Sequence, residues 1–344
     1  MELTLDPDQR DLQQTARRFV AEHPDGEWPR LADLGWLGLA IPERHGGAGA
    51  SRSDMAVIFE ELGRAAVPGP IFTSAVLAAD LLSLVAPTWC DEMLPLIAEG
   101  GARIAVLVDG LLKPETAGPL TIEGSRVSGT ADVLAADDHC THYLVVNADE
   151  CALVEAADVA IERHHGFVPE AITAQFASAP ARTQAIDAAA AMTAILRATP
   201  ILCAYQVGSC QSVFEMSVAY SGERVQFGKA IGTFQRVQDH IIDLVNAAES
   251  ARWATNYAVW RTDAADSSAH DIATAVHVAK SVTATSHVDA CTSAHEVHAG
   301  IGVDLQYHLA RHTHASRSLY SFLGDPRWHR RRLTVELDLL PRSR

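Results

Sequence analysis

The sequence predicts an α+β fold in three parts, and three patterns along the 344-residue chain support this prediction. Apolar residues recur every three or four positions in the first hundred residues, as they do on one face of a helix. Short runs of branched apolar residues follow from about residue 103. Long alanine-rich segments return after residue 184 and indicate a helical bundle. We therefore expect an N-terminal helical domain at 1–100, a small middle β-domain at 101–183 and a C-terminal four-helix bundle at 184–344.

The first part contains two candidate amphipathic helices, at 6–22 and 53–66, and the second is followed by the helix-ending residues Pro68 and Pro70. A glycine-rich stretch at 46–49 lies between them. A phosphate-binding loop would need a strand before this stretch and Gly-Lys-Ser/Thr after it, and neither is predicted here. We interpret it as a loop that joins helices.

The middle part has short β-type runs at 104–108, 126–129 and 143–146, with Gly, Pro and Asp residues between them. The alanine-rich part begins at about residue 185. Glycine-containing breaks interrupt its helices at three places: 222–232, 300–302 and 324–326. This order of helices, strands and helices gives the three-domain prediction.

Composition excludes several classes of protein. The net charge of −16 disfavours a nucleic-acid-binding protein, because a phosphate backbone requires a basic surface. Binding of any other polyanionic ligand would require local Lys and Arg side chains. We see no apolar run that approaches the roughly 20 residues of a membrane span, and Met1 to Thr4 does not resemble a signal peptide. We expect a cytoplasmic protein with no membrane association.

The cysteines and histidines do not predict a metal site. The six cysteines are widely spaced, without a Cys-x-x-Cys pair, and indicate reduced thiols that are mostly buried. His308, His312 and His314 could in principle share one helical face as metal ligands. Because Arg311 and Arg317 lie near them, surface or interface positions are the simpler interpretation. We expect no metal.

The most informative segment is Arg-Val-Gln-Phe-Gly-Lys-Ala-Ile-Gly-Thr-Phe-Gln, at residues 224–235. It is predicted to join two helices through glycine-containing turns. The Arg224 guanidinium can donate two hydrogen bonds to a pyrophosphate. Phe227 offers a flat apolar face, and the Gln235 amide can both donate and accept. An ordinary turn between helices with a buried Phe is the alternative for the short Arg-x-x-Phe-Gly part alone.

This segment resembles the flavin-binding signature of the acyl-CoA dehydrogenase family. Residues 34–49 with 60–64 resemble the N-terminal helical domain of that family. Residues 295–303 resemble its Gln-x-x-Gly-Gly-x-Gly-Phe element, although Glu296 replaces the Gln and Ala299 replaces the first Gly. Together these resemblances cover almost the whole chain and imply the same three-domain fold.

The resemblance implies a role in binding FAD. In the family the signature reaches the FAD of a neighbouring subunit, so Arg224, Gln226, Phe227 and Gln235 are candidate FAD-binding residues. Glu296 and Gly300 are further candidates on the second element, where a carboxylate would repel a pyrophosphate. The family also implies an acyl-CoA substrate and an electron-transfer flavoprotein as electron acceptor.

Other positions depart from the family pattern. The catalytic base is usually a Glu, either directly before a Gly or on the long helix before the signature, and these positions correspond to Leu323 and Ala198. Asp325 is the nearest carboxylate and is the candidate base, although Asp-Pro more often caps a helix. Residues 113–118 replace the family's Thr-Glu-Pro-x-x-Gly-Ser-Asp stretch, and residues 131–134 replace its Trp-Ile-Thr element.

This pattern of retained and lost residues resembles the short, degenerate subunit of the actinobacterial heterotetrameric acyl-CoA dehydrogenases of steroid side-chain catabolism. Our first hypothesis is that the chain completes an FAD site in an α2β2 complex, while a homologous partner supplies the base. A self-sufficient homo-oligomeric dehydrogenase with a relocated base is the second hypothesis. A non-enzymatic scaffold of the same fold is the third.

Overall fold

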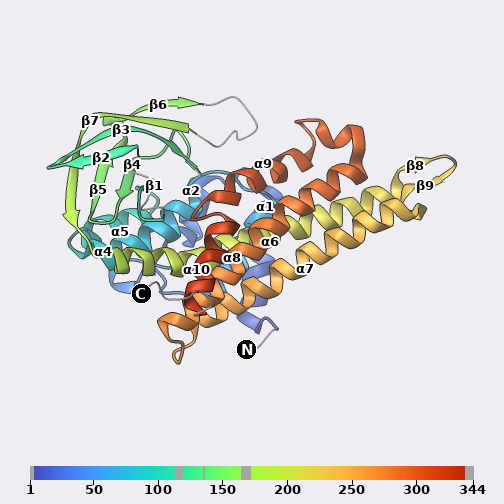
Figure 1. The fold of residues 1–344 in the computed structure, drawn as a ribbon, viewed down its shortest axis with the longest axis horizontal. Coiled ribbons are helices and arrows are strands. Elements are labelled where there is room, and N and C mark those ends of the chain that lie inside the picture. The colour runs from blue at the N-terminus through green and yellow to red at the C-terminus, as the bar shows by residue number, and fades with distance from the viewer. Residues whose placement is uncertain (1–3, 113–118, 135, 164–171, 338–344) are drawn as a thin grey trace, which may run out of the picture. The chain divides into compact units, whose positions relative to one another are not determined.

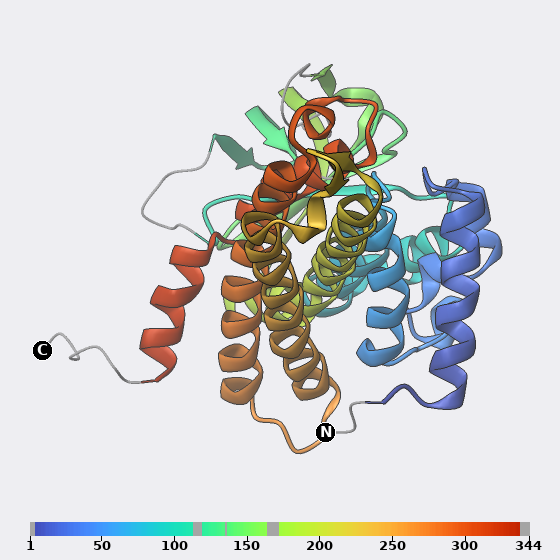
Figure 2. The ribbon, with the colours of Figure 1, turned by 90° about the vertical axis from the view of Figure 1, so that its right-hand side faces the viewer.

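The computed structural model describes residues 4–112, 119–134, 136–163 and 172–337. Figure 1 and Figure 2 show helices at both ends of the chain and strands between them. The chain divides into two compact units, which are described separately. The first unit comprises Met1–Pro24, Ala56–Val67 and Pro200–Arg344, and the second comprises Asp25–Met55 and Pro68–Thr199. Two of the four boundaries, after Met55 and after Thr199, fall within helices, so the division into three domains remains a prediction.

Helices fill the chain up to residue 98, as predicted. They are α1 (Pro7–Glu22), α2 (Trp28–Asp33), α3 (Arg52–Arg64), α4 (Ala79–Val85) and α5 (Cys90–Ala98), with the short turns η1 (Trp36–Gly38), η2 (Glu43–His45), η3 (Thr73–Ala78) and η4 (Pro87–Trp89). Asp6 caps α1 by accepting a hydrogen bond of 2.8 Å from the Gln9 backbone N–H. A Cβ on Gly47 would lie 2.0 Å from the Ile41 carbonyl oxygen. The glycine-rich stretch is therefore a tightly packed loop.

A curled sheet follows in the second unit. Its strands are β1 (Ile104–Val108), β2 (Leu120–Glu123), β3 (Arg126–Val133), β4 (His142–Val146), β5 (Glu150–Glu155), β6 (Ala160–Arg163) and β7 (Ile172–Ala185), with η5 (Ala156–Asp158) after β5. The order is β1-β4-β5-β7-β3-β2, with β6 also paired to β7, and only the β1–β4 pair is parallel among the described strands. β7 is long enough to pair with β5 at one end and with β3 and β6 at the other, which joins both halves of the sheet.

Helices return at residue 188. They are α6 (Ala188–Glu223), α7 (Gln235–Asp263), α8 (Ala269–His298), α9 (His308–Ser321) and α10 (Pro326–Glu336), with the hairpin β8 (Val225–Gln226) and β9 (Lys229–Ala230) and the turns η6 (Ile231–Thr233) and η7 (Ala299–Val303). Apolar side chains of α6, α7, α8 and α9 form one core cluster. All six cysteines of the chain are free and buried, as predicted.

One helix differs from the expectation that no apolar stretch reaches the length of a membrane span. α6 is long and apolar enough to cross a membrane by length and composition, because no charged residue occurs between Arg197 and Glu215. More than half of its apolar window is buried inside the protein. Since the core helix of a soluble bundle has the same properties, α6 alone is weak evidence for a membrane span.

In the first unit, α3 and α6 cross with their backbones in contact. A Cβ on Gly63 would lie 1.8 Å from the Tyr205 carbonyl oxygen, and one on Gly208 would lie 1.8 Å from the Glu60 carbonyl oxygen. Such distances are far below any van der Waals contact, so glycine is required on both helices. The Tyr205 hydroxyl also donates to the Val67 carbonyl at 3.0 Å, which fixes the end of α3.

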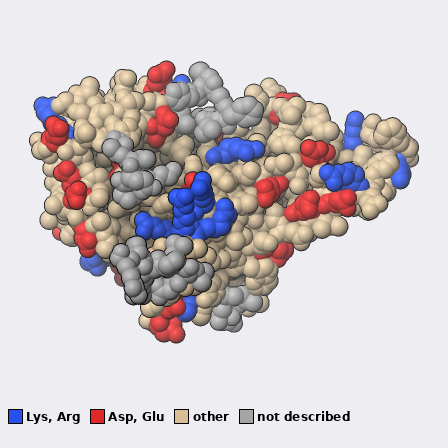
Figure 3. Space-filling view, in the orientation of Figure 1, with Lys and Arg blue, Asp and Glu red and all other residues tan. Residues whose placement is uncertain are grey.

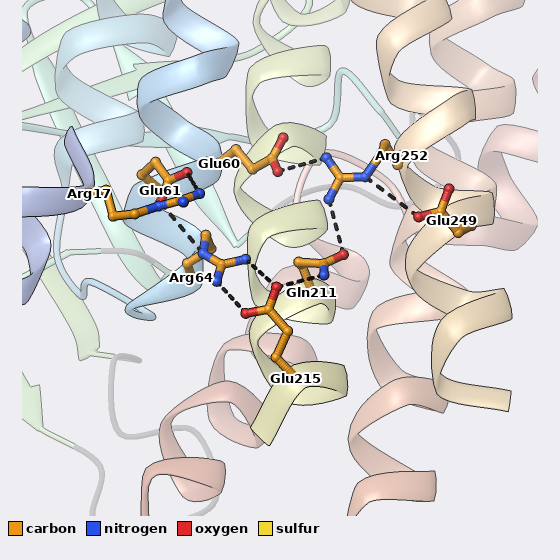
Figure 4. A network of polar contacts seen from close by, with 8 residues as sticks. All are labelled: Arg17, Glu60, Glu61, Arg64, Gln211, Glu215, Glu249 and Arg252. Atoms are coloured by element: carbon orange, nitrogen blue, oxygen red, sulfur yellow. Dashed lines mark hydrogen bonds and ion pairs between the residues drawn. The ribbon is translucent and has the colours of Figure 1, made fainter. Parts of the chain in front are cut away.

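Charged side chains surround this crossing (Figure 4). Glu61 is fully buried and accepts hydrogen bonds from Arg17, the shorter at 2.7 Å. Arg64 forms an ion pair with Glu215, and although burial acts to raise the pKa of Glu215, its hydrogen bonds from Arg64 and Gln211 lower it. Arg252 joins α7 to this network through Glu60, at 2.7 Å. Glu215 therefore has a structural partner in α3.

Buried histidines form polar contacts between the helices of the first unit. The Ser209 hydroxyl lies 2.6 Å from His287 Nε2 and 2.7 Å from His312 Nδ1, which connects α6, α8 and α9. His277 Nδ1 lies 2.9 Å from His329 Nδ1 and connects α8 with α10. Burial lowers the pKa of His287 and His329 to about 3, and of His277 and His312 to about 4. These histidines are neutral in the folded protein at neutral pH.

Replacing Gly208 by Ala should lower the free energy of unfolding by about 1–3 kcal/mol, because the added methyl group would force α3 and α6 apart. Gly222 is the matched control, since it lies on the same helix and a Cβ there would meet nothing within 4 Å. Gly222→Ala should stabilise the protein by about 0.5–1 kcal/mol. Urea denaturation of both variants tests this, and equal effects would contradict the crossing.

Stability should fall on acidification from about pH 6.5 to about pH 4. The pKa values of the buried histidines are lowered in the folded state, so the unfolded state binds more protons in this range. Each such histidine contributes up to about 1.4 kcal/mol per pH unit, and we expect a total loss of at least about 2 kcal/mol between about pH 7 and pH 5.5. Urea denaturation across this range provides the measurement.

His312→Asn should make this pH dependence shallower, because one buried imidazole is removed. His139→Asn is its control, since His139 is exposed. A pH profile that is equally steep in both variants and the parent would show that the buried histidines are not its source.

Candidate flavin-binding site

The signature segment forms a hairpin between α6 and α7. Val225 pairs with Ala230 and Gln226 pairs with Lys229, and the two residues of the turn are Phe227 and Gly228, with φ of +53° and +79°. Positive φ at both positions is typical of a type I′ turn, in which glycine is favoured and phenylalanine is strained. The Ile231 backbone N–H donates to the Arg224 carbonyl at 2.8 Å and closes the segment.

The side chains of this hairpin face solvent. Phe227 is 93% exposed, and its ring makes a T-shaped contact with Phe234, at a centroid distance of 6.1 Å. Lys229 Nζ lies 4.3 Å from the centre of the Phe234 ring. Arg224 and Gln235 are exposed as well. The interpretation of this segment as a turn with a buried Phe is therefore wrong, because the hairpin projects the ring away from the core.

The structure brings the candidate residues of the signature onto one short segment. Arg224 follows the end of α6, Gln226 lies on β8, and Gln235 is the first residue of α7. The Gln226 amide donates to the neighbouring Val225 carbonyl at 2.7 Å. The segment thus presents a guanidinium group, a phenyl ring and amide groups to solvent, which are the groups that contact a dinucleotide.

The second candidate element is the turn after α8. Glu296 lies on the last turn of the helix and Gly300 lies in η7, and both are exposed. Ala299, between them, has φ +51° and ψ −129°, a conformation that favours glycine. The backbone therefore adopts a glycine-type turn although the first glycine of the family pattern is missing.

His298 connects this turn to the end of α6. Its ring is 1% exposed and stacks on Tyr220 at a centroid distance of 4.5 Å. Its Nε2 lies 3.3 Å from the Ser217 hydroxyl and its Nδ1 lies 3.0 Å from the Tyr307 hydroxyl. Burial lowers the pKa of His298 to about 4, so the ring is neutral at neutral pH. His298, Tyr220 and Tyr307 therefore position the turn after α8 against the end of α6.

Sequence reasoning did not assign a role to these positioning residues. The His-x-x-His spacing of His295 and His298 at the end of a helix was the available signal. It could not identify the partners, because Ser217 and Tyr220 are about eighty residues earlier in the chain and meet His298 only in the folded protein.

The two positions that the family resemblance assigns to the base hold apolar residues. Ala198 is fully buried on α6, and Leu323 is 3% exposed in the turn before α10. Asp325 caps α10, accepting a hydrogen bond of 2.7 Å from the Trp328 backbone N–H. In the sheet, Ala131 and Val133 of β3 offer no side-chain donor. The stretch at 113–118 lies outside the described residues.

Buried polar groups fix the turn at Leu323, which has φ +57°. His329 Nε2 lies 3.0 Å from the Leu323 carbonyl oxygen. Lys280 Nζ donates to the Leu319 carbonyl at 2.7 Å, and burial lowers the pKa of Lys280 to about 8. Polar contacts on both sides of the turn therefore stabilise its strained backbone.

Backbone strain recurs at the turns that resemble the family. Among the described residues, the non-glycine residues with positive φ are Ala66, Ser178, Phe227, Ala299 and Leu323. Phe227, Ala299 and Leu323 lie in the signature hairpin, the turn after α8 and the turn of the family's base. Such strain costs about 1–3 kcal/mol per residue and is typical of functional sites. These three turns therefore have a strained backbone although their side chains depart from the family pattern.

The structure gives no support for a metal site in the parts of the chain that it describes. No group of three or more His, Cys, Asp or Glu side chains there is placed to bind a metal ion. His312 is buried and hydrogen-bonded to Ser209, whereas His308 is exposed.

Ala299→Gly should raise the free energy of unfolding by about 1 kcal/mol, because it relieves the strain at φ +51°. Ala247→Gly, in the middle of α7, is the control and should lower it by about 1 kcal/mol. Urea denaturation distinguishes the two. Destabilisation by both substitutions would contradict a strained Ala299.

Comparisons with known proteins identify the family of this chain. The family model for the acyl-CoA dehydrogenase N-terminal domain matches residues 6–101, and the model for the C-terminal domain matches residues 188–336. Acyl-CoA dehydrogenase IpdE2 of Mycolicibacterium smegmatis is 30% identical over 313 residues, which are 90% of this chain and 87% of the relative.

Solved structures share the fold over nearly the whole chain. The Tcur3481-Tcur3483 steroid ACAD G363A variant has a TM-score of 0.81 and 26% identity, and the match covers 98% of this chain and 99% of that one. The ChsE4-ChsE5 complex from Mycobacterium tuberculosis also has a TM-score of 0.81, at 22% identity, over 99% and 100% of the two chains. The chain belongs to the acyl-CoA dehydrogenase family of FAD-dependent oxidoreductases.

Proposed function

We propose that this chain is one subunit of a heteromeric acyl-CoA dehydrogenase and that residues 224–235 complete an FAD site on a homologous partner subunit. One contrast carries the proposal. Both positions that the family resemblance assigns to the base hold buried apolar residues, Ala198 and Leu323, whereas the cationic and aromatic hairpin is retained and exposed.

The residues of the hairpin fit part of a dinucleotide. Arg224 would pair with the pyrophosphate, where a planar guanidinium can donate two hydrogen bonds. Phe227 would provide an apolar face and Gln235 would provide amide contacts, and Gln226 lies beside them. Glu296 fits a pyrophosphate less well because of its charge, whereas Gly300 can approach one closely through its backbone.

The sheet fits the flavin ring less well. Ala131 and Val133 cannot donate hydrogen bonds from their side chains, and the Asp132 carboxylate accepts one from the Thr173 hydroxyl at 2.6 Å. The groups that would orient a flavin on this chain are therefore sparse among the described residues. This contrast favours the contribution of a half-site over a complete site.

The proposed division of labour follows from the reaction. FAD, when bound, accepts a hydride from the β-carbon of the acyl group, and a base must remove the α-proton. This chain would bind and orient the dinucleotide through Arg224, Phe227 and Gln235. The partner would supply the carboxylate, because Ala198 and Leu323 cannot take up a proton.

The relatives suggest the substrate class and the partner. One is a steroid ACAD whose name joins Tcur3481 and Tcur3483. We infer that the substrate is an acyl-CoA thioester, with a steroid side chain as the first candidate, and that the assembly is an α2β2 heterotetramer. An electron-transfer flavoprotein in the cytoplasm is the electron acceptor that the family implies.

A self-sufficient dehydrogenase that uses Asp325 as its base is the second candidate function. The carboxylate of Asp325 is half-buried and near the turn that carries the family's base, which favours it over other carboxylates. Its hydrogen bond with the Trp328 backbone N–H is the observation against it, since that bond gives Asp325 a capping role. A scaffold without activity would leave the exposed hairpin unexplained.

Flavin content tests the half-site proposal. We expect little or no absorbance near about 450 nm, the band of oxidised flavin, for the chain expressed alone. Co-expression with a homologous dehydrogenase from the same genome should give a complex with about one FAD per pair of chains. In that complex Arg224→Gln should weaken FAD binding about tenfold to a hundredfold, because a charge-assisted hydrogen bond contributes about 1.5–3 kcal/mol.

Arg18→Gln is the matched control, since Arg18 is an exposed arginine on α1, and it should leave FAD binding unchanged. A full complement of flavin in the chain expressed alone would contradict the half-site proposal. So would a complex whose flavin content is the same with Arg224→Gln.

Asp325→Asn separates capping from catalysis. Asn is as good an N-cap as Asp, so the variant should keep its stability within about 0.5 kcal/mol, and the complex should keep its dehydrogenase activity. Asp325→Ala should lose about 1 kcal/mol of stability. A loss of activity by orders of magnitude in the stable Asn variant would instead identify Asp325 as the base.

A further inference from the structure

A row of arginines on α10 forms the densest positive charge in this acidic chain. Arg327, Arg330 and Arg331 are exposed, and none of them forms an ion pair with another described residue. Lys and Arg side chains gather at the place where α10 lies (Figure 3). Because positions three and four apart share one face of a helix, the three guanidinium groups form one surface. We call this surface the arginine face.

The carboxylates of α10 and of its cap have other partners. Asp325 accepts a hydrogen bond from the Trp328 backbone N–H, and Glu336 lies 2.9 Å from His270 Nδ1. Arg332, beside the arginine face, stacks over the Trp328 ring at 5.2 Å. The charge of the arginine face is therefore not neutralised by the described part of its own helix.

The arginine face does not serve the stability of the helix. Like charges at neighbouring positions repel each other, and Arg327 lies in the first turn, where the helix dipole disfavours a cation. The opposite side of α10 anchors it, because Pro326 and His329 are buried and His329 contacts His277 of α8. The helix is therefore fixed by its buried side, and the row of charges on its exposed side is unfavourable for the helix itself. This favours a role of the row in binding a negatively charged partner.

A complementary pair of charges lies on α7. Asp239 and Asp243 are exposed, one turn apart, and neither forms an ion pair in the described structure, even with Arg236 one turn earlier. Arg327 and Arg331 have the same spacing of four residues. Two helices that pack side by side could therefore form two ion pairs at once, about 6 Å apart along each helix.

These aspartates cannot pair with the arginine face of the same molecule. Thr255 of α7 contacts Thr283 of α8 at 3.1 Å. Since these consecutive helices run in opposite directions, His277, which anchors α10 and lies six residues before Thr283, is level with about residue 261 of α7. Asp243 is then roughly 25 Å away along the helix. The complementary pair must come from another molecule, and a copy of this chain carries it.

We propose that the arginine face of α10 binds the Asp239 and Asp243 pair of a second copy of this chain. The contact is reciprocal, since each copy carries both surfaces, and a two-fold axis therefore forms it twice. It is independent of the proposed FAD contact of the hairpin. In an α2β2 complex it would connect the two copies of this chain.

A charge-swap experiment tests the proposal. Sedimentation equilibrium of the chain alone, at about 50 mM NaCl, should show a dimer that dissociates at about 500 mM NaCl as the charges are screened. Arg327→Glu with Arg331→Glu should weaken dimerisation at least about tenfold. Asp239→Arg with Asp243→Arg should do the same. The combination of all four substitutions should restore the dimer, because the charges are again complementary.

Arg18→Glu with Arg30→Glu is the matched control. It changes the net charge as much as the double substitution on α10, and both residues are exposed, so it should leave the dimer intact. Recovery in the four-residue variant also excludes misfolding as the cause of the loss.

Three results would overturn the proposal. The first is a chain that stays monomeric at low salt and at every accessible concentration. The second is a dimer that the substitutions on α10 do not affect. The third is a monomer that binds free CoA in isothermal titration and loses this binding with Arg327→Glu and Arg331→Glu, which would make the arginine face a site for a phosphate-bearing ligand. Flavin content of a co-expressed complex is a separate measurement, so this proposal and the proposed function can fail independently.

Discussion

The contact between α3 and α6 at Gly63 and Gly208 is the constraint on which much of the first unit depends. With no side chain at either position, the backbones approach more closely than any other residue would allow. This brings Arg64 within reach of Glu215 on α6, and Glu60 within reach of Arg252 on α7. Glu61 on α3 is fully buried, and a buried carboxylate requires partners such as Arg17 and Arg64. The ion pairs of α3 with α6 and α7 are thus a consequence of the crossing.

α6 carries this crossing near its middle and the signature hairpin at its end. Any displacement at Gly208 would be transmitted along a continuous helix toward Arg224, because a helix behaves as a rigid rod over such a length. His298 and Tyr220 stabilise the far end of the same helix against α8. The geometry of the exposed hairpin therefore depends on contacts that are themselves buried and distant in sequence.

The turns at Ala299 and Leu323 show that a backbone conformation can be present without the side chains that the family pattern has there. At Ala299 and Leu323 the residue types that would explain the backbone conformation are absent, yet the conformation is present. The buried groups His329 and Lys280 stabilise the turn at Leu323 through contacts with backbone carbonyls. A turn that is fixed by its surroundings tolerates the loss of its functional side chain, whereas a site made only of side chains does not.

Local signals predicted the elements that local interactions determine. Asp6 and Pro7 mark the start of α1, and the runs at 104–108 and 143–146 became β1 and β4. The length of β7 was not predicted, because its alternation is weak and its pairing with both halves of the sheet is a tertiary property. The motif identified the hairpin residues, but it could not show that Phe227 would be exposed.

The candidate site was predictable in its residue types and not in its supports. Arg224 and Gln235 follow from the signature alone. The contacts of His298 with Ser217 and Tyr307, and the anchoring of α10 by His277, join residues far apart in the chain and have no local pattern. Asp325 shows this limit most clearly, because the same Asp-Pro sequence is compatible with a helix cap and with a carboxylate at an active-site turn.

The burial of every cysteine has a practical consequence for chemical labelling. Burial raises the pKa of Cys140, Cys151, Cys203 and Cys291 to about 12, so reactive thiolate is scarce at neutral pH. A cysteine introduced at an exposed position of the hairpin would then be the one thiol that a maleimide dye modifies rapidly. The natural protein is, in effect, already a cysteine-silent background for fluorescence studies of that hairpin.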